Sequence, residues 1–263
     1  MKQILSVLCY FLFIPLFTVS QQVSKPAEIA VVGLIHSGNK HFNHRTLFRV
    51  LERAKPDLIL WEQSEDFEKV FGLLTANRLR IVRPGIEQLA LQKYAKRNKQ
   101  IRIYGFDTLI NSRKQYIKET IRVDDTFYEM LRRADKTTND SLLYEKFIEI
   151  DNAYYPKFLN GSLSEINRPE VYENAALLYR QEQDSILPMA KKYITDTALI
   201  NDFEKDILFW TLRNDYMVKQ ILKYAKQYQG KRIVVLTGLN HKYYLVSKLR
   251  QEDVPVNLIE LDL

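Results

Sequence analysis

The sequence has a single cysteine, Cys9, in a chain of 263 residues. It lies inside an N-terminal apolar run, and the rest of the chain has none. A disulfide framework, a thiolate metal site and a cysteine nucleophile are therefore excluded for that remainder. Stability has to come from a packed core, and any bound metal has to be held by histidine, aspartate or glutamate.

The sequence also lacks a His-Glu-x-x-His pair, a repeat of solenoid length and a nucleic-acid-binding motif. The formal net charge is +7, and basic residues are densest at 93–102. Leu89, Tyr94 and Ala95 keep helical spacing there, which favours the solvated face of a helix over an anion-binding surface. We therefore expect no nucleic-acid partner.

The first twenty residues have the pattern of a secretory signal peptide. Apolar residues run from Ile4 to Val19, interrupted by Pro15, after a single charge at Lys2. Small residues occupy the first and third positions before Gln21, as at a cleavage site. The run is short for a membrane span. We predict a cleaved signal peptide at 1–20 and a mature chain that is periplasmic or secreted, without a stable membrane span. An uncleaved N-terminal anchor is the alternative.

The remaining pattern predicts one α/β domain over residues 21–263. Apolar runs at 28–35, 57–61, 101–106 and 231–237 are typical of buried parallel strands. Between and after them the periodicity predicts helices at 43–55, 66–80 and 86–98, a short helix ending near 251, and a last strand at 256–261. Only helical patterns occur from about 112 to 228. The predicted fold is a mainly parallel central sheet with flanking helices and a long helical insertion between the third and fourth strands.

Four predicted strands end in side chains that can move protons or bind a metal: His36, Glu62, Asp107 and His241. Ligands of open parallel sheets bind outside the carboxyl ends of the strands, so these four side chains are expected in one crevice. For Asp107, a role in substrate binding competes with the capping of a following helix. A histidine or glutamate after a strand can also be a satisfied structural residue.

Two glycines strengthen the interpretation of these histidines as a site. Gly33 and Gly238 each lie three residues before a histidine, at a strand end. Glycine there permits a tight turn and a close approach of the backbone to a ligand. His41 and His44 follow His36 without a known metal-ligand spacing, and we expect both to be surface residues.

The last helix of the insertion supplies another pair of candidates. Asn214 occupies its apolar stripe, and Arg213 adjoins it. A polar residue on a buried stripe needs a partner. The functional interpretation directs Arg213 at the crevice, where it binds substrate or stabilises an oxyanion, with Asn214 as a substrate-binding neighbour. The structural alternative pairs Arg213 with a carboxylate.

These motifs, Gly-Leu-Ile-His36, Leu-Trp-Glu62, Arg213-Asn214-Asp-Tyr-Met and Leu-Thr-Gly-Leu-Asn-His241, resemble the superfamily of TraB/PrgY, Tiki and erythromycin-esterase-like proteins. That group also includes the ChaN-type haem-uptake proteins. The resemblance spans nearly the whole mature chain but is specific only at the short motifs. It implies a shared site of His36, Glu62, His241 and Arg213. The sequence departs from the usual first motif after His36, where Ser-Gly-Asn-Lys follows, and this affects the expected substrate.

The leading hypothesis is an exported hydrolase, peptidase-like or esterase-like, acting on a small molecule or a peptide. In one form His36, Glu62 and His241 hold a divalent metal that activates water. In the other a histidine, oriented by Glu62, is the general base without metal. In both, Arg213 stabilises the oxyanion.

The alternative is an exported protein that binds haem or another iron ligand. In that case His36 and His241, or a tyrosine such as Tyr243 or Tyr244, would ligate the iron. A third hypothesis, an interaction protein with a decayed site, ranks last because every motif residue is present.

Overall fold

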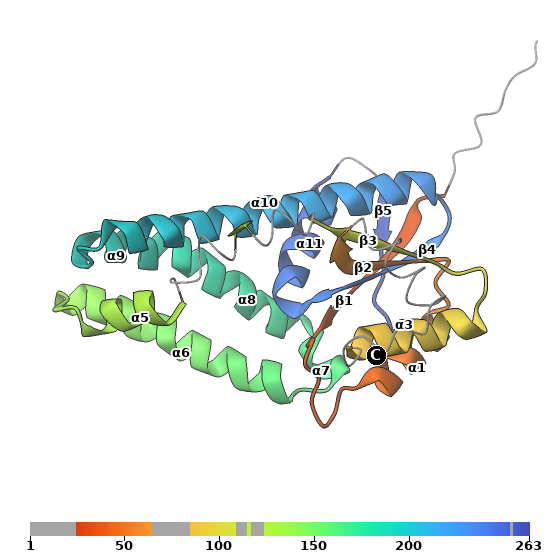
Figure 1. The fold of residues 1–263 in the computed structure, drawn as a ribbon, viewed down its shortest axis with the longest axis horizontal. Helices are drawn as coiled ribbons and strands as arrows, with labels where there is room; N and C mark the ends of the chain where they lie inside the picture. The colour runs from red at the N-terminus through yellow and green to blue at the C-terminus, as the bar shows by residue number, and fades with distance from the viewer. Residues whose placement is uncertain (1–24, 65–84, 109–114, 117–123, 253–254) are drawn as a thin grey trace, which may run out of the picture.

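The structure, a computed structural model, describes residues 25–64, 85–108, 115–116, 124–252 and 255–263. Its centre is a five-stranded parallel sheet with helices on both faces (Figure 1). In chain order the strands are β1 (Ala27–Leu34), β2 (Leu58–Ser64), β3 (Arg102–Asp107), β4 (Arg232–Gly238) and β5 (Val256–Leu258). Their order across the sheet is β3-β2-β4-β1-β5. The predicted fold class is confirmed. The last strand is shorter than the expected 256–261, because it pairs only with the first residues of β1.

Alternate residues of each central strand enter two different cores, as the period of a pleated strand requires. On one face, Val234 and Leu236 pack in the core that also contains the buried residues of α1 (His44–Ala54) and α3 (Ile86–Arg97). On the other face, Ile233 and Val235 pack with residues of α10 (Thr197–Gln227) and α11 (Leu239–Gln251). Both faces of the sheet are therefore covered.

Helix α1 has defined capping residues at both of its ends. The side chain of Asn43 accepts hydrogen bonds from the backbone N–H groups of Arg45 and Thr46. The helix ends at Lys55, which has a left-handed φ of 47°, and Pro56 follows. Proline cannot continue the helix, so the chain turns directly into β2.

The described regular elements of the predicted insertion are all helices, and they extend to one side of the sheet (Figure 1). It comprises α5 (Asp124–Arg133), α6 (Thr138–Asn160), α7 (Leu163–Ile166), α8 (Pro169–Gln181), the π-helix η1 (Glu182–Ile186), α9 (Leu187–Tyr193) and α10. With 31 residues, α10 runs from the insertion back across the sheet (Figure 1). It therefore carries residues of the insertion to the carboxyl edge of the strands.

Within the described ranges, no helix combines the length and apolar character needed to cross a membrane. The expected signal peptide at 1–20 and the expected helix at 66–80 lie outside the described residues.

Candidate active site

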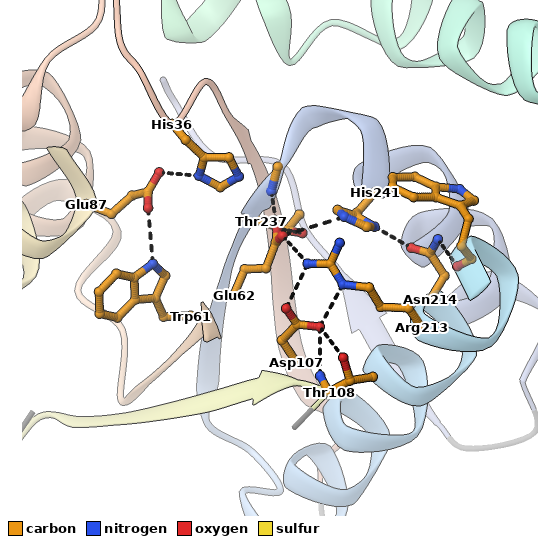
Figure 2. Close-up of polar contacts among 12 residues, drawn as sticks. His36, Trp61, Glu62, Glu87, Asp107, Thr108, Arg213, Asn214, Thr237 and His241 are labelled. Carbon is orange, nitrogen blue, oxygen red and sulfur yellow. Dashed lines mark hydrogen bonds and ion pairs between the residues drawn. The ribbon is translucent and has the colours of Figure 1, made fainter. Parts of the chain in front are cut away.

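The structure brings the four strand-end residues of the sequence analysis to one edge of the sheet (Figure 2). His36 lies in the turn after β1, Glu62 near the end of β2, and Asp107 is the last residue of β3. His241 lies in the first turn of α11, directly after β4. These strands are neighbours in the order β3-β2-β4-β1, which explains the convergence.

Glu62 is the centre of this cluster and is only 6% exposed. Its Oε1 atom accepts from Nη2 of Arg213 at 2.7 Å and lies 3.5 Å from Nε2 of His241. Its Oε2 atom accepts from Oγ1 of Thr237 at 2.9 Å and from the backbone N–H of Gly238. Both carboxylate oxygens are thus fixed by donors from α10 and β4.

An irregularity in β2 accompanies the placement of Glu62. The pairing of β2 with β3 changes register between Trp61 and Ser64, on either side of this glutamate. Such bulges redirect side chains and are common beside active sites. Gly105 of β3 lies against the irregular segment, and a Cβ atom there would be 2.2 Å from the carbonyl oxygen of Ser64. The absence of a side chain at Gly105 is therefore what allows the two strands to approach.

Arg213 is buried and joins the two carboxylates of the site. Its Nε and Nη2 atoms donate to the two oxygens of Asp107 at 2.8 and 2.7 Å, and Nη2 also donates to Glu62. Asp107 accepts in addition from the backbone N–H of Thr108 at 2.7 Å. Arg213 therefore forms the carboxylate pair that the structural alternative predicts. Among the described residues no hydrogen bond involves Nη1.

His241 is 4% exposed and is fixed on two sides by residues of α10. Its Nδ1 atom lies 2.7 Å from Oδ1 of Asn214, and the Nδ2 atom of Asn214 donates to the carbonyl of Trp210 at 2.8 Å. The indole of Trp210 stacks on the imidazole with 4.1 Å between ring centroids. Because Oδ1 can only accept, the hydrogen of a neutral His241 lies on Nδ1, and Nε2 carries the lone pair.

His36 differs from His241 in exposure and in its partner. Its side chain is 55% exposed, and its Nδ1 atom lies 2.8 Å from Oε1 of Glu87 on α3. The other oxygen of Glu87 accepts from Nε1 of Trp61 at 3.2 Å. Glu87 therefore contacts His36, and Glu62 contacts His241. A carboxylate at Nδ1 fixes the orientation of the imidazole ring.

The two glycines of the motifs have different surroundings. A Cβ atom on Gly238 would lie 3.0 Å from Nε2 of His36, 3.4 Å from Oε2 of Glu62 and 3.6 Å from Cδ2 of His241. Gly238 is thus at the meeting point of the three side chains. Gly33 lies inside β1 rather than in a turn, where it packs closely against Leu239 and not against the site.

Burial and the positive charge of Arg213 determine the protonation states of Glu62 and His241. Burial alone would raise the pKa of Glu62, but the positive charges of His241, Arg213 and His36 and the N–H of Gly238 lower it to about 2. Burial lowers the pKa of His241 to about 4, against the attraction of Glu62. At neutral pH His241 is therefore uncharged, and Arg213 is the buried cation that keeps Glu62 ionised.

The ligand set does not suit a divalent cation. Within the described part of the chain, no group of three or more His, Cys, Asp or Glu side chains is placed to hold one. Both oxygens of Glu62 already accept hydrogen bonds, and the Arg213 guanidinium occupies the side of Oε1. A metal at Glu62 would have to displace a buried cation. The expectation of a metal on His36, Glu62 and His241 stays a prediction without support from this geometry.

Other candidates lie apart from this cluster. His41 is exposed and His44 is the first residue of α1, as expected of surface residues. The hydroxyl of Tyr244 donates to Asp215 at 2.7 Å, and the ring of Tyr243 stacks on Tyr179. Burial raises the pKa of Tyr243 to about 12, which opposes the tyrosinate form that ligates haem iron. The haem hypothesis stays a prediction.

Sequence reasoning missed Glu87, Trp61, Trp210 and Gly105. A signal for Glu87 was present, because Glu87, Ala90, Leu91 and Tyr94 form the buried stripe of α3, and a carboxylate on such a stripe needs a partner. The other three look like ordinary core or strand residues until the neighbouring elements are placed.

Fold and site together define a parallel α/β protein with a polar cluster at the carboxyl edge of its sheet. No protein-family model matches the sequence, and none of the curated proteins compared with it matches. One solved structure, a mutant of an erythromycin esterase in its open conformation, is similar with a TM-score of 0.33 and 12% sequence identity. The similarity covers 81% of this chain and 60% of that chain. It is a distant likeness to one member of the group named from the motifs and does not extend to the TraB/PrgY, Tiki or ChaN members.

Proposed function

We propose that this chain is a hydrolase, acting on an ester or amide, in which His36 is the general base. The observation that carries the proposal is the pair of His36 and Glu87 beside the Glu62–Arg213 cluster. The general base has to exchange its proton with the solvent, and His36 is half-exposed whereas His241 is buried. A pKa of about 4 also makes His241 a weak base at neutral pH.

In the proposed reaction, Nε2 of His36 takes a proton from a water molecule, and the hydroxide adds to the carbonyl carbon of the substrate. The carboxylate of Glu87 stabilises the imidazolium that forms. The lone pair on Nε2 of His241 accepts the second hydrogen of the water and orients it. Collapse of the tetrahedral intermediate transfers the proton from His36 to the leaving group.

Arg213 is proposed to meet the oxyanion through Nη1, while its other nitrogens are fixed by Asp107 and Glu62. A donor held in place before the reaction stabilises developing charge without reorganisation. Glu62 is not a second base, because its pKa is about 2 and both of its oxygens are occupied. Its proposed role is to hold Arg213 and the start of α11.

Hydrolysis of a panel of neutral p-nitrophenyl esters by the purified full chain tests the proposal. We expect His36→Ala to lower kcat/KM by about a hundredfold or more, and Glu87→Gln by about tenfold. His41→Ala and His44→Ala are matched controls and should retain activity. Losses in His36→Ala, Glu62→Gln and His241→Ala should be non-additive, because the three act in one step.

The same assay separates the metal-free reaction from the metal hypothesis. We expect activity to survive exhaustive treatment with a chelator. Loss of activity that a divalent ion restores would contradict the proposal and favour a metal on these histidines.

A further inference from the structure

The edge of β1 has no strand partner at Gly33, the glycine that precedes His36. Ile259, the residue after β5, donates its backbone N–H to the carbonyl of Ile29, so Ile29 faces β5. Backbone groups alternate between the two neighbours of a strand, and Gly33 therefore faces the same side. The pairing of β1 with β5 ends at Ile29. The N–H and C=O groups of Gly33 thus need partners from outside the sheet.

The side-chain amide of Asn167, which lies between α7 and α8, supplies both partners. Its Oδ1 atom accepts from the N–H of Gly33 at 2.7 Å, and its Nδ2 atom donates to the carbonyl of Gly33 at 2.8 Å. Nδ2 also donates to the carbonyl of Leu163 at 2.8 Å. The helical insertion is therefore hydrogen-bonded to the backbone of the strand that leads to His36.

Lys242, the residue after His241, contacts the same amide from α11. Its Nζ atom donates to Oδ1 and to the backbone carbonyl of Asn167 at 2.9 and 3.1 Å. Oδ1 thus accepts from both Gly33 and Lys242, which uses both of its lone pairs. We call the side chains of Asn167 and Lys242 the amide clamp, because together they connect the segments of the two histidines.

The ammonium group of Lys242 is buried at a cost. Lys242 is 1% exposed, and among the described residues no carboxylate forms an ion pair with it. Burial lowers its pKa to about 8, although Glu260 attracts the charge. Replacement of a buried charge by an apolar side chain of similar size is often neutral or stabilising. Stability of the fold therefore does not explain why an ammonium group occupies this position.

We propose that Asn167 and Lys242 are positioning residues, which hold the segment of His36 against α11 and fix both to the helical insertion. The inference rests on the proposed function, in which His36 and His241 contact one water molecule. A misplacement of about 1 Å can lower a rate by about a hundredfold. Partial loss of the amide clamp should therefore lower kcat in a protein that still folds and still binds its substrate.

Lys242→Met in the full chain tests the clamp without reference to catalysis. Methionine keeps most of the length of the side chain and removes the charge, so Tm should stay within about 5 °C of wild type. Hydrogen exchange at the amide of Gly33 should become about tenfold faster, because Oδ1 of Asn167 is held less firmly. The amide of Val32 faces β4 and should exchange as in wild type.

Hydrolysis of neutral p-nitrophenyl esters tests the positioning. We expect kcat of Lys242→Met to fall by about tenfold, with KM changed by less than about twofold. Lys248→Met removes a half-buried lysine from the same helix and should match wild type in exchange and in rate. Asn167→Ala should lower kcat further, and Lys242→Met added to it should have no additional effect. If Asn167→Ala does not fold, Lys242→Met alone decides.

The outcomes separate the clamp from the hydrolase proposal. Unchanged exchange at Gly33 in Lys242→Met would overturn the clamp, even if wild type hydrolyses esters. Faster exchange with an unchanged kcat would leave a purely structural contact and overturn the positioning role. If wild type hydrolyses no ester, the catalytic proposal is wrong and the ring NMR signals of His36 decide. They should shift in Lys242→Met but not in Lys248→Met, and unshifted signals in both would contradict the inference.

Discussion

Asn214 lies 2.7 Å from the Nδ1 atom of His241 and accepts its hydrogen, which fixes the tautomer of a buried imidazole. The proposed reaction depends on this, because only that tautomer presents a lone pair on Nε2 to water. Asn214, the residue that interrupts the apolar stripe of α10, thus positions a histidine.

Replacement of Asn214 tests this role. In Asn214→Leu the acceptor is lost, and His241 is free to place its hydrogen on Nε2 and donate it to Glu62. We expect kcat for ester hydrolysis to fall by about tenfold with little change in KM. Asn214→Asp retains an acceptor and should lose less. Nitrogen-15 chemical shifts of the His241 ring report the tautomer, and an unchanged tautomer in Asn214→Leu would contradict the assignment.

The buried, uncharged His241 makes stability depend on pH. Its pKa is lowered from 6.5 in a model compound to about 4 in the fold, so the unfolded chain binds a proton first. The contribution of His241 to the free energy of unfolding is therefore fully present above about pH 6.5 and is lost as the pH falls toward 4. Between pH 7 and pH 5 this group should cost about 2 kcal/mol of unfolding free energy.

Urea unfolding at pH 7 and pH 5, in wild type and His241→Gln, measures that term. Glutamine does not titrate, so the decrease between the two pH values should be about 2 kcal/mol smaller in the variant. The remaining histidines contribute equally to both proteins and cancel. Equal pH dependence in the two proteins would show that His241 titrates normally in the fold.

Gly105 should be essential for the fold at the end of β2. A methyl group there would lie 2.2 Å from a backbone oxygen, and backbone cannot rotate away as a side chain can. We expect Gly105→Ala to destabilise the protein by about 3 kcal/mol or more. Gly85→Ala is the control, since no atom of the described residues lies within 4 Å of a Cβ there, and its cost should be about 1 kcal/mol or less.

The sheet could be predicted well from the sequence because the residues that specify each strand are local in the chain. Continuous apolar runs such as 233–236 occur where a strand is buried on both faces, and the polar residues that follow each run mark the carboxyl edge. Convergence of His36, Glu62, Asp107 and His241 then follows from a general property of parallel sheets. This convergence could be predicted without knowing the order of the strands in the sheet.

The partners of these residues could not be predicted in the same way. Two similar Gly-x-x-His motifs suggested similar histidines, yet His36 is half-exposed and His241 is buried. The difference arises because α11 begins directly after β4, whereas β1 is followed by a turn and a loop before α1. Contacts such as Arg213 with Asp107 join residues 106 positions apart and depend on where α10 crosses the sheet.

Export remains a prediction from the first twenty residues. A cleaved signal peptide should yield a mature chain that begins at Gln21. N-terminal sequencing of protein recovered from the envelope or the medium measures the first residue. A membrane-bound product that retains Met1 would instead support the anchor alternative.

Gly238 offers a direct test that His36, Glu62 and His241 form one site. Its φ of −57° is ordinary, so alanine there adds no backbone strain. The added methyl group would lie 3.0 Å from Nε2 of His36 and 3.4 Å from Oε2 of Glu62. His36 can move outward because its side chain is half-exposed. We therefore expect Gly238→Ala to fold with a loss of about 1 kcal/mol, but to hydrolyse esters at least tenfold more slowly.

Gly33→Ala is the matched control for this substitution. A methyl group at Gly33 would meet Leu239 at 2.7 Å in the core between β1 and α11, away from the reacting groups. It should lower stability more than Gly238→Ala does and affect the rate of the folded enzyme less. Thermal unfolding and kcat/KM, measured on both variants, separate the two effects. The reverse pattern, with activity lost in Gly33→Ala and kept in Gly238→Ala, would place the reacting groups elsewhere than around Gly238.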